Sequence, residues 1–103
     1  SPNNAIERPI IYELIGDFQN KSILDLGCGD ASFGKELLKQ GARYYTGIEG
    51  SEQMVVSAYH NLANEDSTIH HETMESYSYP PQKFDIVTSR FAIHYVSDVH
   101  LLF

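Results

Sequence analysis

The sequence of 103 residues has few basic residues, a single cysteine and no long apolar run. Its seven Lys and Arg stand against 14 Asp and Glu, and the net charge of -7 disfavours the phosphate backbone of a nucleic acid as a partner. No segment is long and apolar enough to cross a bilayer, so no membrane partner is expected. Cys28 alone excludes an internal disulfide and a CxxC metal site. We therefore expect no metal and a reducing compartment.

The start of the chain also lacks the basic and then apolar order of a secretory signal, which predicts a cytoplasmic location. What the chain does contain is typical of a folded protein, with 42% hydrophobic and 12% aromatic residues. A chain of this length can bury one modest core, and we expect one domain.

The central feature is the segment SILDLGCGDASFG, residues 22–34. An apolar run ends there in Asp25 and then breaks into two closely spaced glycines, Gly27 and Gly29. We interpret the segment as a buried strand, a tight loop that allows close approach of a ligand, and the start of a helix. The first free amides of that helix would face whatever lies over the glycines.

The remaining elements follow from apolar periodicity and from turn residues. The helix that follows the loop places Phe33, Leu37 and Leu38 inward, and the next helix begins after Ser51 and buries Met54, Val55, Ala58 and Leu62. In chain order we predict a lead-in helix over 6–15, strands over 21–26, 43–49, 68–71 and 84–89, and helices over 31–40, 52–63 and 91–103.

Helices that alternate with short buried strands predict an α/β fold, with a Rossmann-like parallel sheet, right-handed crossovers and helices on both faces. Ligands of such sheets bind beyond the carboxyl ends of the strands, where the strand order reverses. Three places fall at those ends, and we expect them to converge on one crevice. They are the loop 25–31, Glu49, and Ser89 with Arg90.

Glu49 ends a strand about 20 residues after the glycine loop, where a Rossmann domain places the acid that binds ribose hydroxyls. The alternative is a solvated carboxylate at a strand end. Asp25, two residues before Gly27, would repel a pyrophosphate and favour a ligand with an ammonium and a sulfonium group. Ser32 also replaces the third glycine of GxGxxG. Both features disfavour a dinucleotide.

With these motifs the sequence resembles the class I S-adenosylmethionine-dependent methyltransferases, in particular the small ones with a compact Rossmann-like domain. ILDLGCGDASFG, residues 23–34, is similar to their first motif, although Ala31 stands where glycine is commoner. YTGIEGSEQMVVSA, residues 45–58, is similar to the second motif, and FDIVTSRFAIHYVSD, residues 84–98, resembles the fourth strand and the following helix. The likeness covers nearly the whole chain.

The resemblance implies S-adenosylmethionine as cofactor, with Glu49 on the ribose hydroxyls and Ser51 and Met54 near the nucleoside. The third motif has several alignments within residues 71–75, of which we choose Thr73 and Met74 for the adenine. Met74 could equally fill space in the loop. The implied cofactor-binding set is Asp25, Gly27, Cys28, Gly29, Glu49, Gly50, Ser51, Met54, Thr73, Met74 and Ser89.

Other chemically suggestive residues have a plain structural reading. Cys28 lies within the glycine loop, which favours a backbone contact over nucleophilic chemistry. His70 and His71 are adjacent on a strand, face opposite sides and are expected on the surface. His94, Tyr95 and Arg90 are candidates for a catalytic base or for shaping the acceptor pocket, although His94 would also suit helix packing.

The function that we expect is methyl transfer from S-adenosylmethionine to an unidentified small molecule, by direct in-line displacement that needs no dedicated catalytic residue. An NAD-dependent oxidoreductase is the alternative enzyme, and a cofactor-binding or scaffold domain without turnover is the alternative outside enzymology.

Residues 1–103 are expected to be the N-terminal portion of a methyltransferase domain truncated at its C-terminus. The resemblance implies a sheet of seven strands in the order 3-2-1-4-5-7-6, whereas the chain supplies about four. Strand 84–89 would then form an exposed edge, which predicts self-association.

Overall fold

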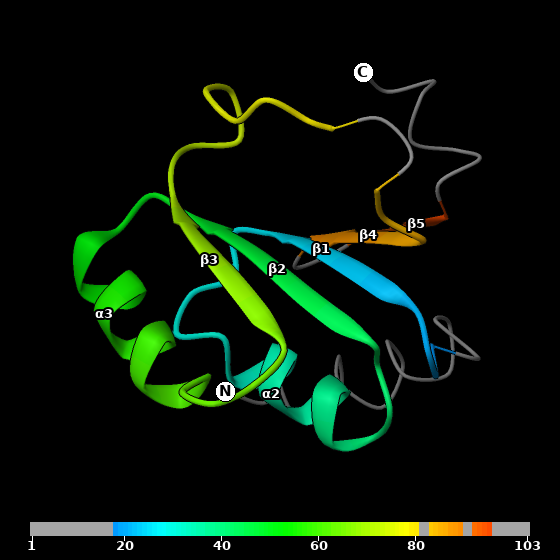
Figure 1. Ribbon diagram of the computed structural model, residues 1–103. Coiled ribbons are helices and arrows are strands. Elements are labelled where there is room, and N and C mark those ends of the chain that lie inside the picture. The colour runs from blue at the N-terminus through cyan, green and yellow to red at the C-terminus, as the bar shows by residue number, and fades with distance from the viewer. Residues whose placement is uncertain (1–17, 81–82, 90–91, 96–103) are drawn as a thin grey trace.

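The computed structural model describes residues 18–80 and 83–89 and the backbone of residues 92–95 (Figure 1). The lead-in helix predicted over 6–15 lies outside these residues. The described elements are β1 (Ser22–Leu26), α2 (Ser32–Lys39), β2 (Tyr44–Glu49), α3 (Glu52–Asn61), β3 (Ser67–His71), β4 (Ile86–Ser89) and β5 (Ala92–Tyr95).

The strands form one sheet in the order β3-β2-β1-β4-β5. β1 pairs in parallel with both β2 and β4, and β2 pairs in parallel with β3, which confirms the predicted α/β class. The chain moves outward from β1 to β3 and then returns to the other side of β1. The strand order therefore reverses at β1, and the carboxyl ends of the four parallel strands meet at one edge of the sheet.

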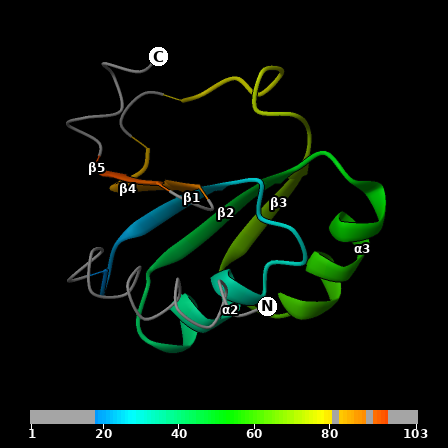
Figure 2. The ribbon, with the colours of Figure 1, turned by 180° about the vertical axis from the view of Figure 1, so that it is seen from behind.

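The two helices α2 and α3 lie on the same face of the sheet, and the segment between β3 and β4 passes over the opposite face (Figures 1 and 2). On the helix side the core contains Ile23, Leu37, Tyr45, Val55 and Ile69. On the other side Leu24, Ile48, Phe84 and Val87 are buried, and the partly buried Tyr77 and Tyr79 pack against them.

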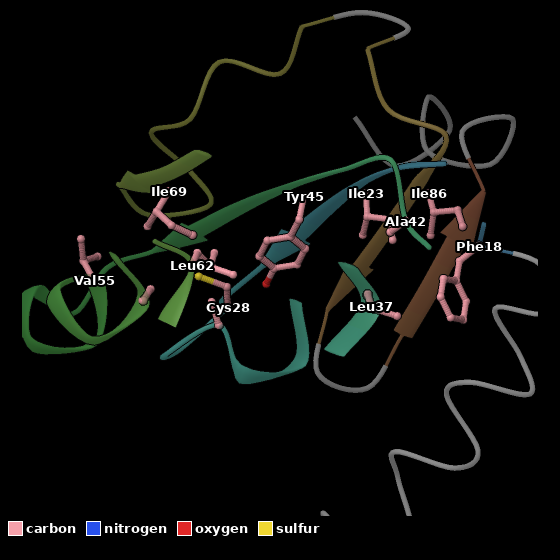
Figure 3. Packing of buried hydrophobic residues seen from close by; sticks show 12 residues of the cluster. Phe18, Ile23, Cys28, Leu37, Ala42, Tyr45, Val55, Leu62, Ile69 and Ile86 are labelled. Atoms are coloured by element: carbon pink, nitrogen blue, oxygen red, sulfur yellow. The ribbon is translucent and has the colours of Figure 1, made fainter. Parts of the chain in front are cut away.

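Gly34 and Gly47 make room for the side chains of Tyr45 and Cys28 on the helix side of the sheet. The Tyr45 ring lies beneath α2, where a Cβ on Gly34 would come within 2.2 Å of ring atom Cζ. In the same way, Cys28 packs on Gly47 of β2, where a Cβ would come within 2.6 Å of Sγ. Tyr45 and Cys28 belong to one buried cluster (Figure 3). The glycines are therefore needed for packing rather than for their backbone freedom.

The helix predicted over 91–103 is wrong over Ala92–Tyr95, which forms β5, and its remainder lies outside the described residues. β5 pairs antiparallel with β4, so the prediction that β4 is an exposed edge is also wrong. Aromatic and β-branched residues such as Ile93 and Tyr95 favour strands. Two residues separate β4 from β5, the shortest common hairpin connection. A short apolar run can suit either structure, and pairing with β4 decided it.

The helix capped by Ser51 is confirmed, since the Ser51 Oγ accepts a hydrogen bond from the Met54 amide at 3.4 Å. Three of its four predicted inner residues are buried, namely Val55, Ala58 and Leu62. Met54 is the exception, with 42% of its surface exposed. The buried residues are spaced three and four apart on one face, and Met54 lies at the flank of that face.

Gly34 provides a test of the packing beneath α2. In a free helix Gly→Ala is favourable by about 1 kcal/mol. Here we expect Gly34→Ala to lower the free energy of unfolding by about 2 kcal/mol, because the new methyl group would overlap the Tyr45 ring. Urea unfolding measures the change, with the exposed Lys35→Ala as the control on the same helix. A stabilised Gly34→Ala would contradict this packing.

Candidate functional site

The loop after β1 turns its amides toward β2. The Gly27 and Cys28 amides both donate to the Ile48 carbonyl, at 2.8 and 3.0 Å. The Gly29 amide donates to Glu49 Oε1 at 2.8 Å. Gly27 and Gly29 have φ values of +74° and +59°, which L side chains rarely adopt, and a Cβ on either would meet no protein atom within 4 Å. The loop is thus fixed on one side and open on the other.

Glu49 connects this loop to the start of α3. Its Oε1 accepts from Gly29, and its Oε2 accepts from the Ser51 amide at 2.9 Å. Its main-chain carbonyl accepts from Glu72, at 3.1 Å, beyond the end of β3. A half-buried carboxylate is therefore held at the point where three segments meet, and each oxygen retains a further lone pair for a ligand.

A pocket of about 200 Å³ lies beside Glu49 at the carboxyl edge of the sheet. It contains five of the residues predicted for the cofactor, from three separate segments: Gly27, Glu49, Gly50, Thr73 and Met74. Three further lining residues, Ile48, Glu72 and Glu75, were not predicted. Ile48 was assigned to the strand interior. Glu72 and Glu75 fall within residues 71–75, for which several alignments with the third motif are possible.

The other predicted residues lie around this pocket without lining it. Cys28 and Gly29 belong to the loop, and Ser51 begins α3. Met54 is exposed on α3, and Ser89 ends β4 in register with Leu26. These residues surround the same edge of the sheet.

Two candidates for a catalytic base, His94 and Tyr95, were predicted to lie beside the pocket, and the structure places them elsewhere. His94 is paired with Val87 and Tyr95 with Ile86, so both lie on β5 toward the amino end of β4 and not at the start of a helix beside the crevice. The antiparallel return of the chain places them there. Arg90 lies outside the described residues.

Asp25 lies on the helix side of β1 and is only 5% exposed. It accepts a hydrogen bond from the Tyr45 hydroxyl. Burial raises the pKa of Asp25 to about 7, the Tyr45 hydrogen bond opposes that rise, and the Glu49 charge adds to it. Asp25 is therefore a buried, partly protonated carboxyl group rather than the charged carboxylate beside the ligand that was expected from the sequence.

The acid that lies at the N-terminus of α2 is Asp30. Its Oδ1 accepts from the Ser32 amide at 3.0 Å and from the Ser32 hydroxyl at 2.7 Å, at the N-terminus of α2. An acid thus occupies the helix end that would otherwise attract a pyrophosphate. The sequence contained a signal for this turn, since an Asp side chain tends to accept a hydrogen bond from the backbone amide two residues later.

Cys28 is poorly suited to act as a nucleophile. Burial, together with the nearby Asp25 and Glu49 charges, raises the pKa of its thiol to about 12. The thiol is therefore protonated at neutral pH, in agreement with the expectation that Cys28 does not act as a nucleophile.

The two adjacent histidines make different contacts. His71 Nε2 lies 3.1 Å from the Gly50 carbonyl at the pocket edge. His70 Nδ1 lies 3.7 Å from a Glu72 carboxylate oxygen, and its ring centroid is 5.2 Å from that of Tyr77. Within residues 18–80 and 83–89 no three His, Cys, Asp or Glu gather as a metal would require. Neither described helix has the length and apolarity to cross a membrane.

A second hollow, of about 490 Å³, lies between α3 and β3. Tyr59, Leu62, Asn64 and Thr68 are among its lining residues. This hollow lies away from the glycine loop, because α3 ends and β3 begins at the opposite edge of the sheet. No predicted site residue lines it.

Comparison with known proteins connects this geometry to a family. Residues 23–102 match the family model described as a methyltransferase domain. An uncharacterised protein of Haemophilus influenzae is 32% identical over 104 residues, covering 95% of this chain and 41% of the relative. A ubiquinone biosynthesis O-methyltransferase of Serratia proteamaculans is 30% identical over 98 residues, covering 92% of this chain and 40% of the relative.

Among solved structures, an S-adenosylmethionine-dependent methyltransferase from Mesorhizobium loti matches with a TM-score of 0.75 and 26% identity. The match covers 81% of this chain and 38% of that protein. The chain thus spans about two fifths of the length of these relatives.

The buried Asp25 predicts a pH dependence of stability. Its pKa is raised from 3.8 to about 7 on folding, so the folded state binds more protons in this range and stability falls as pH rises from 4 to 7. Asp25→Asn removes this titration. Between pH 4 and pH 8 we expect its stability relative to the parent to increase by about 2 to 4 kcal/mol in urea unfolding. The exposed Asp66→Asn is the control, and parallel pH profiles of Asp25→Asn and the parent would contradict the assignment.

Proposed function

The chain belongs to the methyltransferase domain family, among the class I S-adenosylmethionine-dependent methyltransferases, and from this premise we propose that its protein transfers a methyl group from S-adenosylmethionine to a small-molecule acceptor. The observation that carries the proposal is the Glu49 carboxylate, held by the Gly29 and Ser51 amides beside a pocket at the carboxyl edge of the sheet. A carboxylate in this place suits the two hydroxyls of a ribose.

The residues present fit a nucleoside better than a dinucleotide. The amides of Gly27, Cys28 and Gly29 already donate to β2, and the first amide of α2 donates to Asp30. None of these four amides is therefore free to bind a pyrophosphate. These hydrogen bonds favour S-adenosylmethionine over NAD more strongly than the charge of Asp25 does. Isothermal titration with S-adenosylhomocysteine and with NAD tests the choice directly.

In the proposed complex Glu49 binds the ribose hydroxyls, and Thr73 and Met74 lie against the adenine. Gly27 and Gly50 line the pocket with backbone and allow close approach. Cys28, Gly29, Ser51 and Asp25 support these groups from behind, while Met54 and Ser89 lie at the rim. Glu72 and Glu75 join this set as lining residues that the sequence did not predict.

S-adenosylmethionine, when bound, supplies a methyl group already activated on a sulfonium. The chain then has to hold the two partners in line and exclude water, a contribution that can reach ~7 to 11 kcal/mol. No side chain has to form a covalent bond, which agrees with the inert thiol of Cys28. Arg90, which lies outside the described residues, remains a candidate for contact with the acceptor, whereas His94 and Tyr95 lie toward the amino end of β4, away from the pocket.

A small-molecule acceptor is supported by the relatives named for ubiquinone biosynthesis O-methylation and by the acidic net charge of this chain. Turnover of a panel of small hydroxylated and amine acceptors by the full-length protein tests the acceptor class. Binding of S-adenosylhomocysteine without turnover of any acceptor would favour a non-catalytic domain.

Glu49→Ala tests the ribose contact. We expect this change to weaken S-adenosylhomocysteine binding by about 1.5 to 3 kcal/mol, because it removes a charged hydrogen-bond acceptor. Glu49→Gln, which keeps one acceptor oxygen, should lose less. Titration calorimetry on the full-length protein measures both, with the exposed Glu65→Ala as the control. An unchanged affinity in a folded Glu49→Ala protein would remove Glu49 from the site.

We also propose that residues 1–103 are the N-terminal part of a longer methyltransferase domain, supported by the relatives being about two and a half times as long as the matched region. A 1–103 fragment should self-associate through β5, which replaces β4 as an edge of the described sheet, and should transfer methyl groups poorly, because much of the acceptor pocket would be absent. Sedimentation, thermal unfolding and turnover beside the full reading frame measure this. A monomeric, cooperatively folding and fully active fragment would contradict it.

A further inference from the structure

The Tyr45 side chain reaches the base of the glycine loop from beneath α2. Tyr45 is fully buried, and its ring occupies the space that Gly34 leaves free. Its hydroxyl donates to Asp25 Oδ2, so the polar end of a core residue is directed at the strand that enters the loop. Burial and the Asp25 charge raise the pKa of Tyr45 well above its usual value, so this hydroxyl keeps its proton.

The Asp25 carboxyl group is connected to the loop through covalent and packing contacts. Asp25 precedes Gly27 by two residues on the same chain segment. Cys28 packs on Gly47 of β2. It lies in the same cluster as Tyr45, and Figure 3 shows both side chains. β2 therefore contacts both ends of the segment that carries the Gly27 and Cys28 amides, through Tyr45 at Asp25 and through Gly47 at Cys28.

We propose that Tyr45 is a positioning residue for the glycine loop: by holding the Asp25 carboxyl it sets the backbone of Gly27 and Gly29, and so the affinity for S-adenosylmethionine. The proposal deepens the proposed function and rests on it for the identity of the ligand. Tyr45 itself touches no part of the pocket of about 200 Å³.

The charge of Asp25 makes this support dependent on pH. The groups that act on Asp25 electrostatically are Tyr45 and Glu49, and its own charge acts on the thiol of Cys28. From β4 the uncharged Thr88 lies in register beside Asp25, and α2 contributes Gly34 to the space around Tyr45. Since the Tyr45 hydrogen bond lowers the pKa of Asp25, its loss must move the titration to higher pH.

Tyr45→Phe is the matched test, because phenylalanine keeps the ring that fills the space at Gly34 and removes only the hydroxyl. Tyr44→Phe is the control, since it removes a hydroxyl bonded to Thr68 Oγ1 at 2.5 Å, on the neighbouring residue but away from the loop. Asp25→Asn keeps an acceptor for Tyr45 and abolishes the titration. All are made in the full-length protein.

The first measurement needs no ligand. Amide NMR signals of Gly27 and Gly29 are followed from pH 5 to pH 9 in the free protein. We expect them to titrate with one midpoint in the parent and in Tyr44→Phe, with a higher midpoint in Tyr45→Phe, and not at all in Asp25→Asn. Identical midpoints in Tyr45→Phe and the parent, or a titration that survives in Asp25→Asn and so belongs to another group, would overturn the proposal.

The second measurement is the affinity for S-adenosylhomocysteine over the same pH range. The ligand carries an ammonium group, so affinity should rise as Asp25 ionises, and Tyr45→Phe should bind about two- to tenfold more weakly than the parent at pH 7. Equal affinities and pH profiles in these two proteins would overturn the proposal. A parent that binds no S-adenosylhomocysteine would instead contradict the proposed function, while the glycine signals still decide whether Tyr45 positions the loop.

Discussion

The site depends on one set of hydrogen bonds, those by which the loop after β1 donates its amides to β2. The Gly27 and Cys28 amides are bound to the Ile48 carbonyl, and the Gly29 amide is bound to the Glu49 carboxylate. These bonds hold the loop close to β2, orient Glu49 and leave the glycines open on the side away from the protein. They also use the donors with which a phosphate would be bound. The choice between a nucleoside and a dinucleotide therefore follows from where these amides point.

Much of the helix and strand pattern could be predicted, because local signals and tertiary packing agree. Ile23 and Leu24 are apolar in succession because β1 is buried on both faces, and Ser51 marks the start of α3 by capping it. The position of Glu49 followed from its spacing after the glycine loop. The pocket lies there because parallel strands end at the same edge of the sheet.

What the sequence could not supply are facts that depend on contacts between distant residues. The strand Ala92–Tyr95 was predicted as a helix because its apolar spacing fits both, and only pairing with β4 decides it. Asp25 was expected to be a charge beside the ligand. Its burial depends on Tyr45, 20 residues later, and the room for Tyr45 depends on a glycine in α2. Neither relation has a local signal.

The central claim is that a nucleoside binds beside Glu49 at the carboxyl edge of the sheet. The most direct measurement is an NMR titration of the labelled full-length protein with S-adenosylhomocysteine, in which each backbone amide is followed separately. The account predicts the largest shifts at Gly27, Gly29, Gly50 and Thr73, around the smaller pocket. Shifts confined to the larger hollow between α3 and β3, at residues such as Leu62 and Thr68, would contradict it.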